Sequence, residues 1–259
     1  MTSVTENPLT DVPIFSRRNL DALSVDATTG ALLLVDKPAG WTSFDVVAKT
    51  RNLLRIKKVG HTGTLDPMAT GLLVICLGKA TKLADRIQAE EKEYTGTIHF
   101  GATTPTDDAE SGENEQFPTG HLTPEAIHAG AASFLGESMQ IPPIFSARKV
   151  GGERLYRMAR RGETGETVDI PAKQITVHTF DITGVDLPDA RFDIVCSKGT
   201  YIRSLARDLG RKLSTGAYLT ELRRVRSGSF LVEDAVTIHD LQQLAESRRE
   251  ITPGEATPG

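Results

Sequence analysis

Long apolar runs are missing from this sequence. The two longest cover residues 31–35 and 72–77, far short of the ~18 residues that a membrane-spanning helix needs. The N-terminal sequence MTSVTENPLTDVPIF has neither a basic start nor an apolar centre, so we expect no secretory signal. These absences predict a cytoplasmic protein without a membrane partner.

Cysteine and several common catalytic motifs are scarce or missing too. Cys76 and Cys196 are the only cysteines, and each lies inside an apolar run. We interpret them as buried thiols in a reducing compartment, with a disulfide as the alternative. The histidines and cysteines lack metal-ligand spacing, and no phosphate-binding loop, G-x-G-x-x-G or G-x-S-x-G is present. Structural zinc, nucleotide hydrolysis and nicotinamide chemistry are therefore disfavoured.

The composition is otherwise that of a globular chain. Of its 259 residues, 39% are hydrophobic and 25% are charged. The net charge of −4 argues mildly against nucleic acid, but a ligand responds to the local field rather than to the average. Acids gather in residues 107–115, whereas residues 146–161 hold six bases and one acid. The sequence therefore allows a basic face, although charges distributed for solubility are the alternative for 146–161.

Hydrophobic periodicity predicts a mixed set of helices and strands. Apolar runs and alternation indicate strands at 31–35, 72–77, 94–100, 173–180 and 191–196. Helices are expected from Thr42 or Ser43 to Lys58 and over 124–135, 153–161, 201–213 and 238–248. We expect residues 1–28 to be a mobile extension, 103–120 a solvated loop, and 249–259 a flexible tail. The predicted fold class is mixed α/β (α+β) with a largely antiparallel sheet.

The most unusual segment is Gly60-His61-Thr62-Gly63-Thr64-Leu65-Asp66-Pro67. An acid before proline is biased towards extended geometry, and the glycines let other backbone come close. One interpretation is an Asp-Pro turn that stabilises a connection between strands. The other is a carboxylate nucleophile or base held on a rigid loop.

Three strings support the second interpretation: LLVDKPAG at 33–40, GHTGTLDPMATGLL at 60–73 and CSKGTYIRSL at 196–205. In this order they resemble the TruB-type transfer-RNA pseudouridine synthases, and the resemblance runs from about residue 31 to residue 240. It implies one catalytic domain over 29–248, with a mixed sheet flanked by helices and a central active-site cleft. The implied reaction converts the T-loop uridine at position 55 of tRNA to pseudouridine, with no cofactor and no metal.

The resemblance also implies which residues act. Asp66 matches the catalytic aspartate, Tyr94 the tyrosine that stacks on the base, and Arg203 the arginine that pairs with the aspartate. Four residues match positions that bind substrate or line the pocket: Lys37, His61, Tyr201 and Leu222. Contacts to phosphates position RNA rather than read its sequence. The basic residues expected to make such contacts are Arg148, Lys149, Arg154, Arg160, Arg223 and Arg224.

The chemistry is compatible with these residue types. A carboxylate can attack C1′ or C6 of the nucleotide without a metal, and the target must first leave its stack. Burial favours the neutral form of a carboxyl group and an adjacent guanidinium favours the charged form, so Arg203 would keep Asp66 ionised. Taken singly, Tyr94 is typical of a strand face, Arg203 of a solvated helix face, and Leu222 of core packing.

The expected partner is the T-stem-loop of tRNA, and the expected state is a monomer. Many family members carry a C-terminal PUA-type RNA-binding domain, and only about ten residues follow the helix predicted to end at Arg248; we therefore expect no PUA domain. Two hypotheses stand: an enzyme, and a non-catalytic RNA chaperone that unfolds tRNA and releases it. The residues Asp66, Tyr94 and Arg203 favour the enzyme, because a pure binder has no need of a nucleophilic carboxylate.

Overall fold

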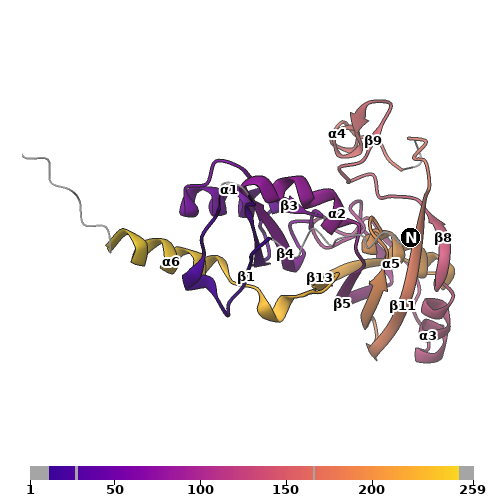
Figure 1. Cartoon of the computed structure of the whole chain (residues 1–259). Helices are drawn as coiled ribbons and strands as arrows, with labels where there is room; N and C mark the ends of the chain where they lie inside the picture. Colours follow the sequence, from indigo (N-terminus) through magenta and orange to yellow (C-terminus); the bar gives the residue numbers. More distant parts are fainter. Residues whose placement is uncertain (1–11, 27–28, 166, 251–259) are drawn as a thin grey trace, which may run out of the picture. The chain divides into compact units, whose positions relative to one another are not determined.

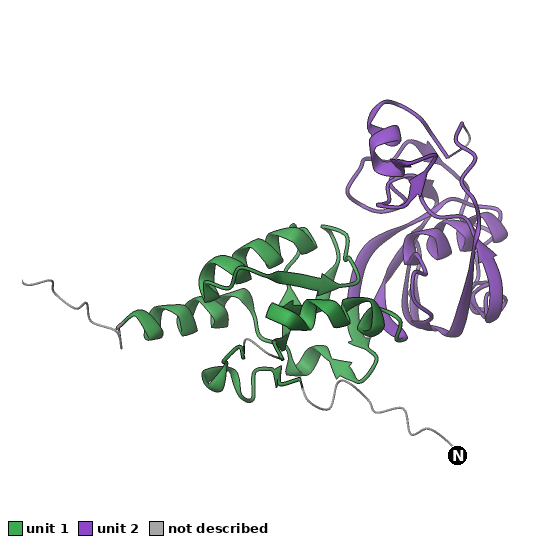
Figure 2. Cartoon of the chain, turned by 45° about the horizontal axis from the view of Figure 1, so that its top comes forward, with its two compact units in different colours: residues 1–90, 224–259 green, residues 91–223 purple. Residues whose placement is uncertain are grey.

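The computed structural model describes residues 12–26, 29–165 and 167–250 (Figure 1). The chain forms two compact units: unit 1 holds residues 1–90 and 224–259, and unit 2 holds residues 91–223 (Figure 2). Each unit combines strands with helices, as expected for a mixed α/β protein. Among the helices in these described ranges, none is long and apolar enough to cross a membrane.

Unit 1 is built around strands β2 and β4, which pair antiparallel from Ala31 opposite Leu77 to Lys37 opposite Gly71. Strand β1 adds to β2 in parallel, and β3 adds to β4 antiparallel. The first part of the unit contains β1 (Ile14–Phe15), a 3-10 turn (Leu20–Ala22), β2 (Ala31–Lys37), α1 (Ser43–Leu54), β3 (Val59–Thr62), β4 (Thr70–Leu77), a second 3-10 turn (Gly78–Leu83) and α2 (Ala84–Gln88). The second part contains β14 (Phe230–Leu231), a 3-10 turn (Val232–Asp234) and α6 (Ile238–Glu250).

The apolar runs of β2 and β4 are continuous because both faces of this sheet are covered. Leu33, Val35 and Ile75 lie in one buried cluster that also holds residues of α1 and α6. Leu34 and Val74 point to the other face, into a cluster that includes Ile87 of α2 and Phe230 of β14. Alternate side chains of a strand point to opposite faces, so each strand contributes to both clusters. Two-sided burial explains why these strands read as unbroken apolar runs.

Helix α1 begins where the sequence predicts. The side chain of Thr42 accepts a hydrogen bond from the amide of Asp45, and the Asp45 carboxylate accepts one from the amide of Thr42. This reciprocal cap pairs amides at the helix start that have no partner inside the helix. The helix ends at Leu54, before Arg55 in the left-handed conformation, and not at the predicted Lys58.

Unit 2 is built on antiparallel strand pairs. Strand β5 (Lys92–Phe100) pairs with β12 (Asp189–Cys196), β12 with β11 (Lys173–Asp186), and β11 with β8 (Gly136–Gln140). Its helices are α3 (Pro124–Ala132), α4 (Leu155–Arg160) and α5 (Ile202–Lys212), and its short strand pairs are β6 (Ala102–Thr103) with β7 (Glu115–Gln116) and β9 (Lys149–Val150) with β10 (Glu153–Arg154). The largely antiparallel pairing agrees with the predicted fold class.

Helix α5 carries the clearest sequence pattern of unit 2. Leu205, Ala206 and Leu209 of its apolar stripe are buried. Gly130 of α3 approaches it so closely that an added Cβ would lie 2.9 Å from a methyl carbon of Leu209. Residues 144–170 form a separate small core around Leu155, with Ile144 and Ile170. The predicted helix at 153–161 is shorter in the structure and belongs to this small core.

Two segments predicted to be solvated are built into the protein. Phe15 and Leu23 are buried in the core of unit 1, so residues 12–26 are not a mobile extension; residues 1–11 and 27–28 lie outside the described ones. In the stretch 103–120, Asp108 is only 1% exposed, and its backbone forms a bridge with that of Leu219. Neither segment has enough apolar residues for its burial to be predicted from the sequence.

Strand β13 (Ala217–Ser227) was missed by the sequence analysis altogether. Residues 217–223 belong to unit 2 and residues 224–227 to unit 1, so the predicted domain over 29–248 is divided between the two units. Of the predicted tail, residues 251–259 lie outside the described residues, whereas α6 includes 249 and 250. Cys76 and Cys196 carry free, buried thiols, as predicted, and burial raises the pKa of each to about 12.

Candidate functional site

Asp66 lies on the loop that connects β3 to β4 in unit 1. Its carbonyl accepts a hydrogen bond from the amide of Ala69 at 3.1 Å, which closes a turn with Pro67 in the second position, where proline is favoured. Leu65 and Ala69 are buried, whereas Asp66 is half-buried. The loop is thus held by its neighbours and leaves Asp66 half-buried.

Two buried polar side chains hold this loop from one side. The Lys37 ammonium, fully buried, donates to the carbonyls of Pro38, Trp41 and Pro67 at 2.9, 2.6 and 3.1 Å. The Ser43 hydroxyl donates to the Leu65 carbonyl at 3.1 Å and accepts from the Leu65 amide at 2.9 Å. Lys37 and Ser43 thereby fix the residues on either side of Asp66.

Arg224 holds the two ends of the same loop. Its guanidinium donates to the carbonyl of Leu72 at 2.7 Å and to that of Gly63 at 3.2 Å. The side chain is only 1% exposed, so the prediction that Arg224 contacts RNA phosphates is wrong. Gly71 has a φ of +100°, and a Cβ there would lie 2.3 Å from the Arg224 carbonyl oxygen. Only glycine allows the backbones to approach this closely.

Replacing Lys37 with methionine tests the loop clamp. Methionine keeps the length of the lysine side chain and its apolar stem. It lacks the ammonium, so the buried carbonyls lose their hydrogen-bond donor. At roughly 1–3 kcal/mol for a buried unpaired group, we expect the free energy of unfolding to fall by about 3 kcal/mol. Urea denaturation measures this loss; the matched variant Lys49→Met, on the same unit's α1, should change little. Equal stability of the two variants would contradict the clamp.

His61 lies on β3, opposite Ile75 of β4. Its Nδ1 is buried and has no hydrogen-bond partner among the described residues. Burial, and then the positive charge of Arg224, lower the pKa of this histidine. His61 is therefore a neutral imidazole at pH 7.

This lowered pKa predicts a pH dependence of stability. Because the folded pKa lies below the unfolded value of about 6.5, the unfolded chain takes up the proton first as the pH falls. The free energy of unfolding should then be highest above pH 6.5 and decrease below it. Urea denaturation at pH 7.5 and 5.5 should show a smaller decrease in His61→Gln than in wild type. The exposed His239 supplies the control: His239→Gln should keep the wild-type decrease, and a decrease unchanged in His61→Gln would refute the prediction.

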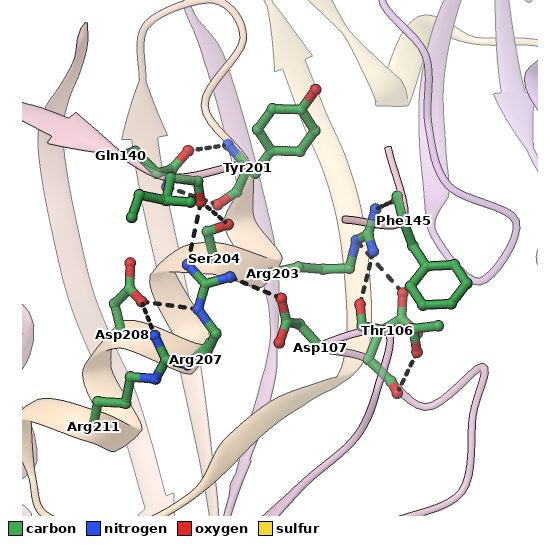
Figure 3. Close-up of polar contacts among 12 residues, drawn as sticks. Thr106, Asp107, Gln140, Phe145, Tyr201, Arg203, Ser204, Arg207, Asp208 and Arg211 are labelled. Atoms are coloured by element: carbon green, nitrogen blue, oxygen red, sulfur yellow. Dashed lines mark hydrogen bonds and ion pairs between the residues drawn. The ribbon is translucent and has the colours of Figure 1, made fainter. Parts of the chain in front are cut away.

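Three of the predicted residues lie on unit 2. Tyr94 is buried on β5, opposite Ile194 of β12, and Leu222 is buried on β13. Tyr201 is the residue before α5, and Gln140 holds its backbone by two hydrogen bonds of 2.8 and 3.0 Å (Figure 3). The start of α5 is therefore anchored to β8.

Arg203 follows in the first turn of α5 and is 3% exposed, so it is not on a solvated helix face. Its guanidinium donates to the carbonyls of Thr106 and Phe145 at 2.7 and 2.9 Å (Figure 3). Its Nε lies 3.5 Å from a carboxylate oxygen of Asp108. The other Asp108 oxygen accepts hydrogen bonds from the Thr106 hydroxyl and the Glu110 amide. Arg203 is thus oriented by a buried loop from the stretch that we predicted to be solvated.

The next arginine on this helix extends the network. Arg207 lies 3.1 Å from Asp107 and 2.9 Å from Asp208, and it donates to the carbonyl of Ile141 (Figure 3). Burial raises the pKa of Asp107, although Arg207 and then Arg203 oppose the shift. Asp107 adopts a φ of +60°, a conformation that Asp tolerates better than most residues. Arg203 and Arg207 of α5 are therefore paired with Asp108 and Asp107 of the 104–108 loop.

The predicted phosphate-contact residues other than Arg224 are on unit 2. Lys149, Arg154 and Arg160 are exposed, and Arg148 and Arg223 are half-buried. Arg154 and Arg160 lie over the ring of Tyr156, with guanidinium carbons 6.0 and 5.6 Å from its centroid. A cation beside an aromatic ring is stabilised by the ring's negative face. These two arginines therefore form a positive surface on α4 and the strand before it.

The predicted catalytic residues come from both units. Asp66 belongs to unit 1, whereas Tyr94 and Arg203 belong to unit 2; their convergence stays a prediction. Ser43 and Asp108 were missed by the sequence analysis. Ser43 follows a helix cap and Asp108 lies in an acidic run, so both resembled ordinary surface residues. Over the described ranges, no group of three or more histidine, cysteine, aspartate or glutamate residues could hold a metal ion.

Two family models match the chain. The first, TruB family pseudouridylate synthase (N terminal domain), matches residues 51–202, and the second, tRNA pseudouridylate synthase B C-terminal domain, matches residues 203–256. The boundary between these models does not coincide with the boundaries of the compact units at residues 90 and 223. Together the two models extend over both units.

Curated relatives and solved structures agree with these models. The tRNA pseudouridine synthase B of Thermobifida fusca is 51% identical over 218 residues, covering 81% of this chain and 73% of the relative. That of Flavobacterium johnsoniae is 49% identical, with coverages of 81% and 93%. A solved Cbf5-Nop10-Gar1 complex contains a chain with 31% identity and a TM-score of 0.66, covering 86% of this chain. This chain spans 57% of that one.

Proposed function

Because the chain belongs to the TruB family of pseudouridylate synthases, we propose that it isomerises the T-loop uridine at position 55 of tRNA to pseudouridine. The observation that carries this proposal is the match to tRNA pseudouridine synthases B at about half of all positions over most of the chain. The geometry of the Asp66 loop adds physical support, since three buried polar side chains hold the backbone of the loop that carries the half-buried Asp66.

Asp66 is the proposed nucleophile. In the reaction the N1–C1′ bond breaks and a C5–C1′ bond forms, the C5 proton leaves to solvent, and N1 takes up a proton. A carboxylate can serve by attacking C1′ or C6, and both alternatives stay open. The clamp made by Lys37, Ser43 and Arg224 supports this role, because a nucleophile held in position avoids an entropic cost at the moment of attack.

Tyr94 and Arg203 have complementary proposed roles. The Tyr94 ring would stack on the everted base, a contact worth about 1–3 kcal/mol in single-strand recognition. The Arg203 guanidinium would keep Asp66 ionised. Two carbonyls and Asp108 orient Arg203 within unit 2, and this rigid orientation favours such a role. Tyr201 and Leu222 are proposed to line the substrate pocket, and His61 to bind the displaced loop as a neutral imidazole.

The T-stem-loop is the proposed part of tRNA that binds. Exposed arginines around Tyr156 would contact phosphates, with Lys149 and Arg148 beside them. Loops of RNA are recognised by shape and by splayed bases, which agrees with a site built for one everted nucleotide. A cytoplasmic location, a monomeric state and a tRNA-folding chaperone role stay predictions.

Tritium release tests the proposed activity. Transcribed tRNA carrying uridine labelled with tritium at C5 should lose label to solvent when mixed with the wild-type protein. Replacing uridine 55 with cytidine should remove this release, whereas replacing a uridine outside the T-arm should not. Absence of release from the unaltered tRNA would refute the enzyme and leave the chaperone hypothesis.

A further inference from the structure

Three cations come together in unit 2 from segments far apart in the sequence. Arg148 precedes β9, Lys173 opens β11, and Lys198 lies in the turn between β12 and α5. The Lys173 ammonium donates to the carbonyl of Lys198 at 3.3 Å. A Cβ added to Gly199 would lie 2.0 Å from the Lys173 nitrogen, so the lysine side chain lies directly over this turn.

These cations act on one another, and no acid of the described residues is among the charges that shift the pKa of Lys173. Burial lowers the pKa of Lys173, and the positive charges of Arg148 and Lys198 lower it further. The Nη1 atom of Arg148 is buried and has no hydrogen-bond partner in the described part of the chain. A buried donor without a partner is destabilising, and neighbouring like charges add repulsion.

Two arginines of unit 2, in contrast, have acidic partners. Arg203 faces Asp108, Arg207 faces Asp107 and Asp208, and each pair offsets the charge that burial penalises. The three-cation cluster therefore has the features of an anion site: converging positive charge, an unused buried donor, and repulsion that an anion would relieve.

The turn that carries Lys198 is rigid. The amide of Ser197 donates to the carbonyl of Thr176, and the Ser197 hydroxyl accepts from the amide of Thr176, both at 2.8 Å. The Thr200 hydroxyl donates to the Ser197 carbonyl at 2.9 Å. The next residue, Tyr201, is anchored by Gln140. Lys198 is thus held on a well-anchored turn, five residues before Arg203 in the chain.

We propose that Arg148, Lys173 and Lys198 form a binding site for one phosphate group of the RNA substrate. The identity of the ligand rests on the proposed function, since the phosphate belongs to the RNA substrate. The proposal gives Lys173 and Lys198 a role that the sequence did not indicate. Lys173 supplies a partly buried ammonium, Lys198 an exposed one, and Arg148 the donor that lacks a partner. A phosphate held here would sit beside the turn that leads into α5.

Salt-dependent RNA binding tests the site. Because each neutralised phosphate contributes about 0.7–0.9 to the slope of log affinity against log salt, Lys198→Gln should reduce that slope by about one contact. At 0.1 M KCl this corresponds to roughly sixfold weaker binding of transcribed tRNA. Lys212→Gln, which removes an exposed lysine of the same unit, should keep the wild-type slope. Equal slopes in the two variants would overturn the site.

Inorganic phosphate provides a test that needs neither RNA nor catalysis. At matched ionic strength, replacing chloride with phosphate should raise the thermal unfolding midpoint of wild type and of Lys212→Gln more than that of Lys198→Gln. An equal shift in Lys198→Gln and wild type, or no shift in wild type, would overturn the proposal. Failure of tritium release with a normal phosphate effect would instead refute the proposed function and leave an anion site of other use.

Discussion

Replacing Asp66 with asparagine should abolish tritium release from tRNA while the protein still binds tRNA with wild-type affinity. Asparagine keeps the shape of the side chain and its place on the clamped loop, but it cannot act as a carboxylate nucleophile. Loss of a nucleophile removes most of an enzyme's rate enhancement, so we expect turnover to fall by on the order of 10⁴-fold or more. Single-turnover release and filter binding on the same preparation measure the two quantities.

The exposed residue Asp85 offers a matched control. Asp85→Asn removes the same charge from unit 1 and should leave both release and binding unchanged. If Asp66→Asn loses binding and turnover together while its urea denaturation matches that of wild type, Asp66 positions the RNA instead of attacking it. Turnover within tenfold of wild type would reject Asp66 as the nucleophile.

Replacing Asp108 with asparagine should destabilise the protein more than any exposed substitution. The change removes the carboxylate charge of Asp108, which lies 3.5 Å from Nε of the buried Arg203 guanidinium. Breaking a buried ion pair by removing one member costs about 3–5 kcal/mol, and we expect a loss of that size in the free energy of unfolding. Because Arg203 would also lose its orientation, tritium release should fall with it.

A double-mutant cycle separates the pair from the rest of the network. Combining Asp108→Asn with Arg203→Met should cost less than the sum of the single changes, with a coupling of about 0.5–3 kcal/mol. Glu153→Gln, which alters a carboxylate paired with the exposed Arg161, should leave the unfolding midpoint near the wild-type value. Additive losses in the cycle would show that Asp108 and Arg203 act independently.

The sequence was sufficient for elements whose stabilisation is local or apolar. Strands β2 and β4 are unbroken apolar runs, and α1 begins with a reciprocal cap between Thr42 and Asp45. Helix α5 shows its apolar stripe, and its bounds differ by one residue at each end from the prediction. In each case the residues that indicate the element lie within it or next to it. The Asp66 loop was recognised for the same reason, since glycines and proline restrict it locally.

Polar residues with distant partners were predicted less well. Arg224 was assigned to RNA, but its guanidinium binds carbonyls at Gly63 and Leu72, on a loop far earlier in the chain. Asp108 was assigned to a solvated loop, but it faces Arg203. Strand β13 has charged residues among its apolar ones, so its sequence lacks the apolar run or regular alternation by which the other strands were predicted. The sequence does not distinguish a charged side chain that is solvated by water from one whose charge is balanced by a buried partner.

The amino-acid sequence by itself determined the family, the candidate for the catalytic aspartate and most of the strands and helices, because motifs, caps and apolar periodicity are short-range features. Only the tertiary structure decided which charges are solvated and which are structural. In the structure Lys37 and Arg224 hold the Asp66 loop, and Asp108 is the partner of Arg203. The contacts between Lys173 and the Lys198 turn support the proposed anion site. The free-energy cost of a charged side chain depends on how deeply it is buried. Burial in turn depends on contacts between residues that are far apart in the sequence.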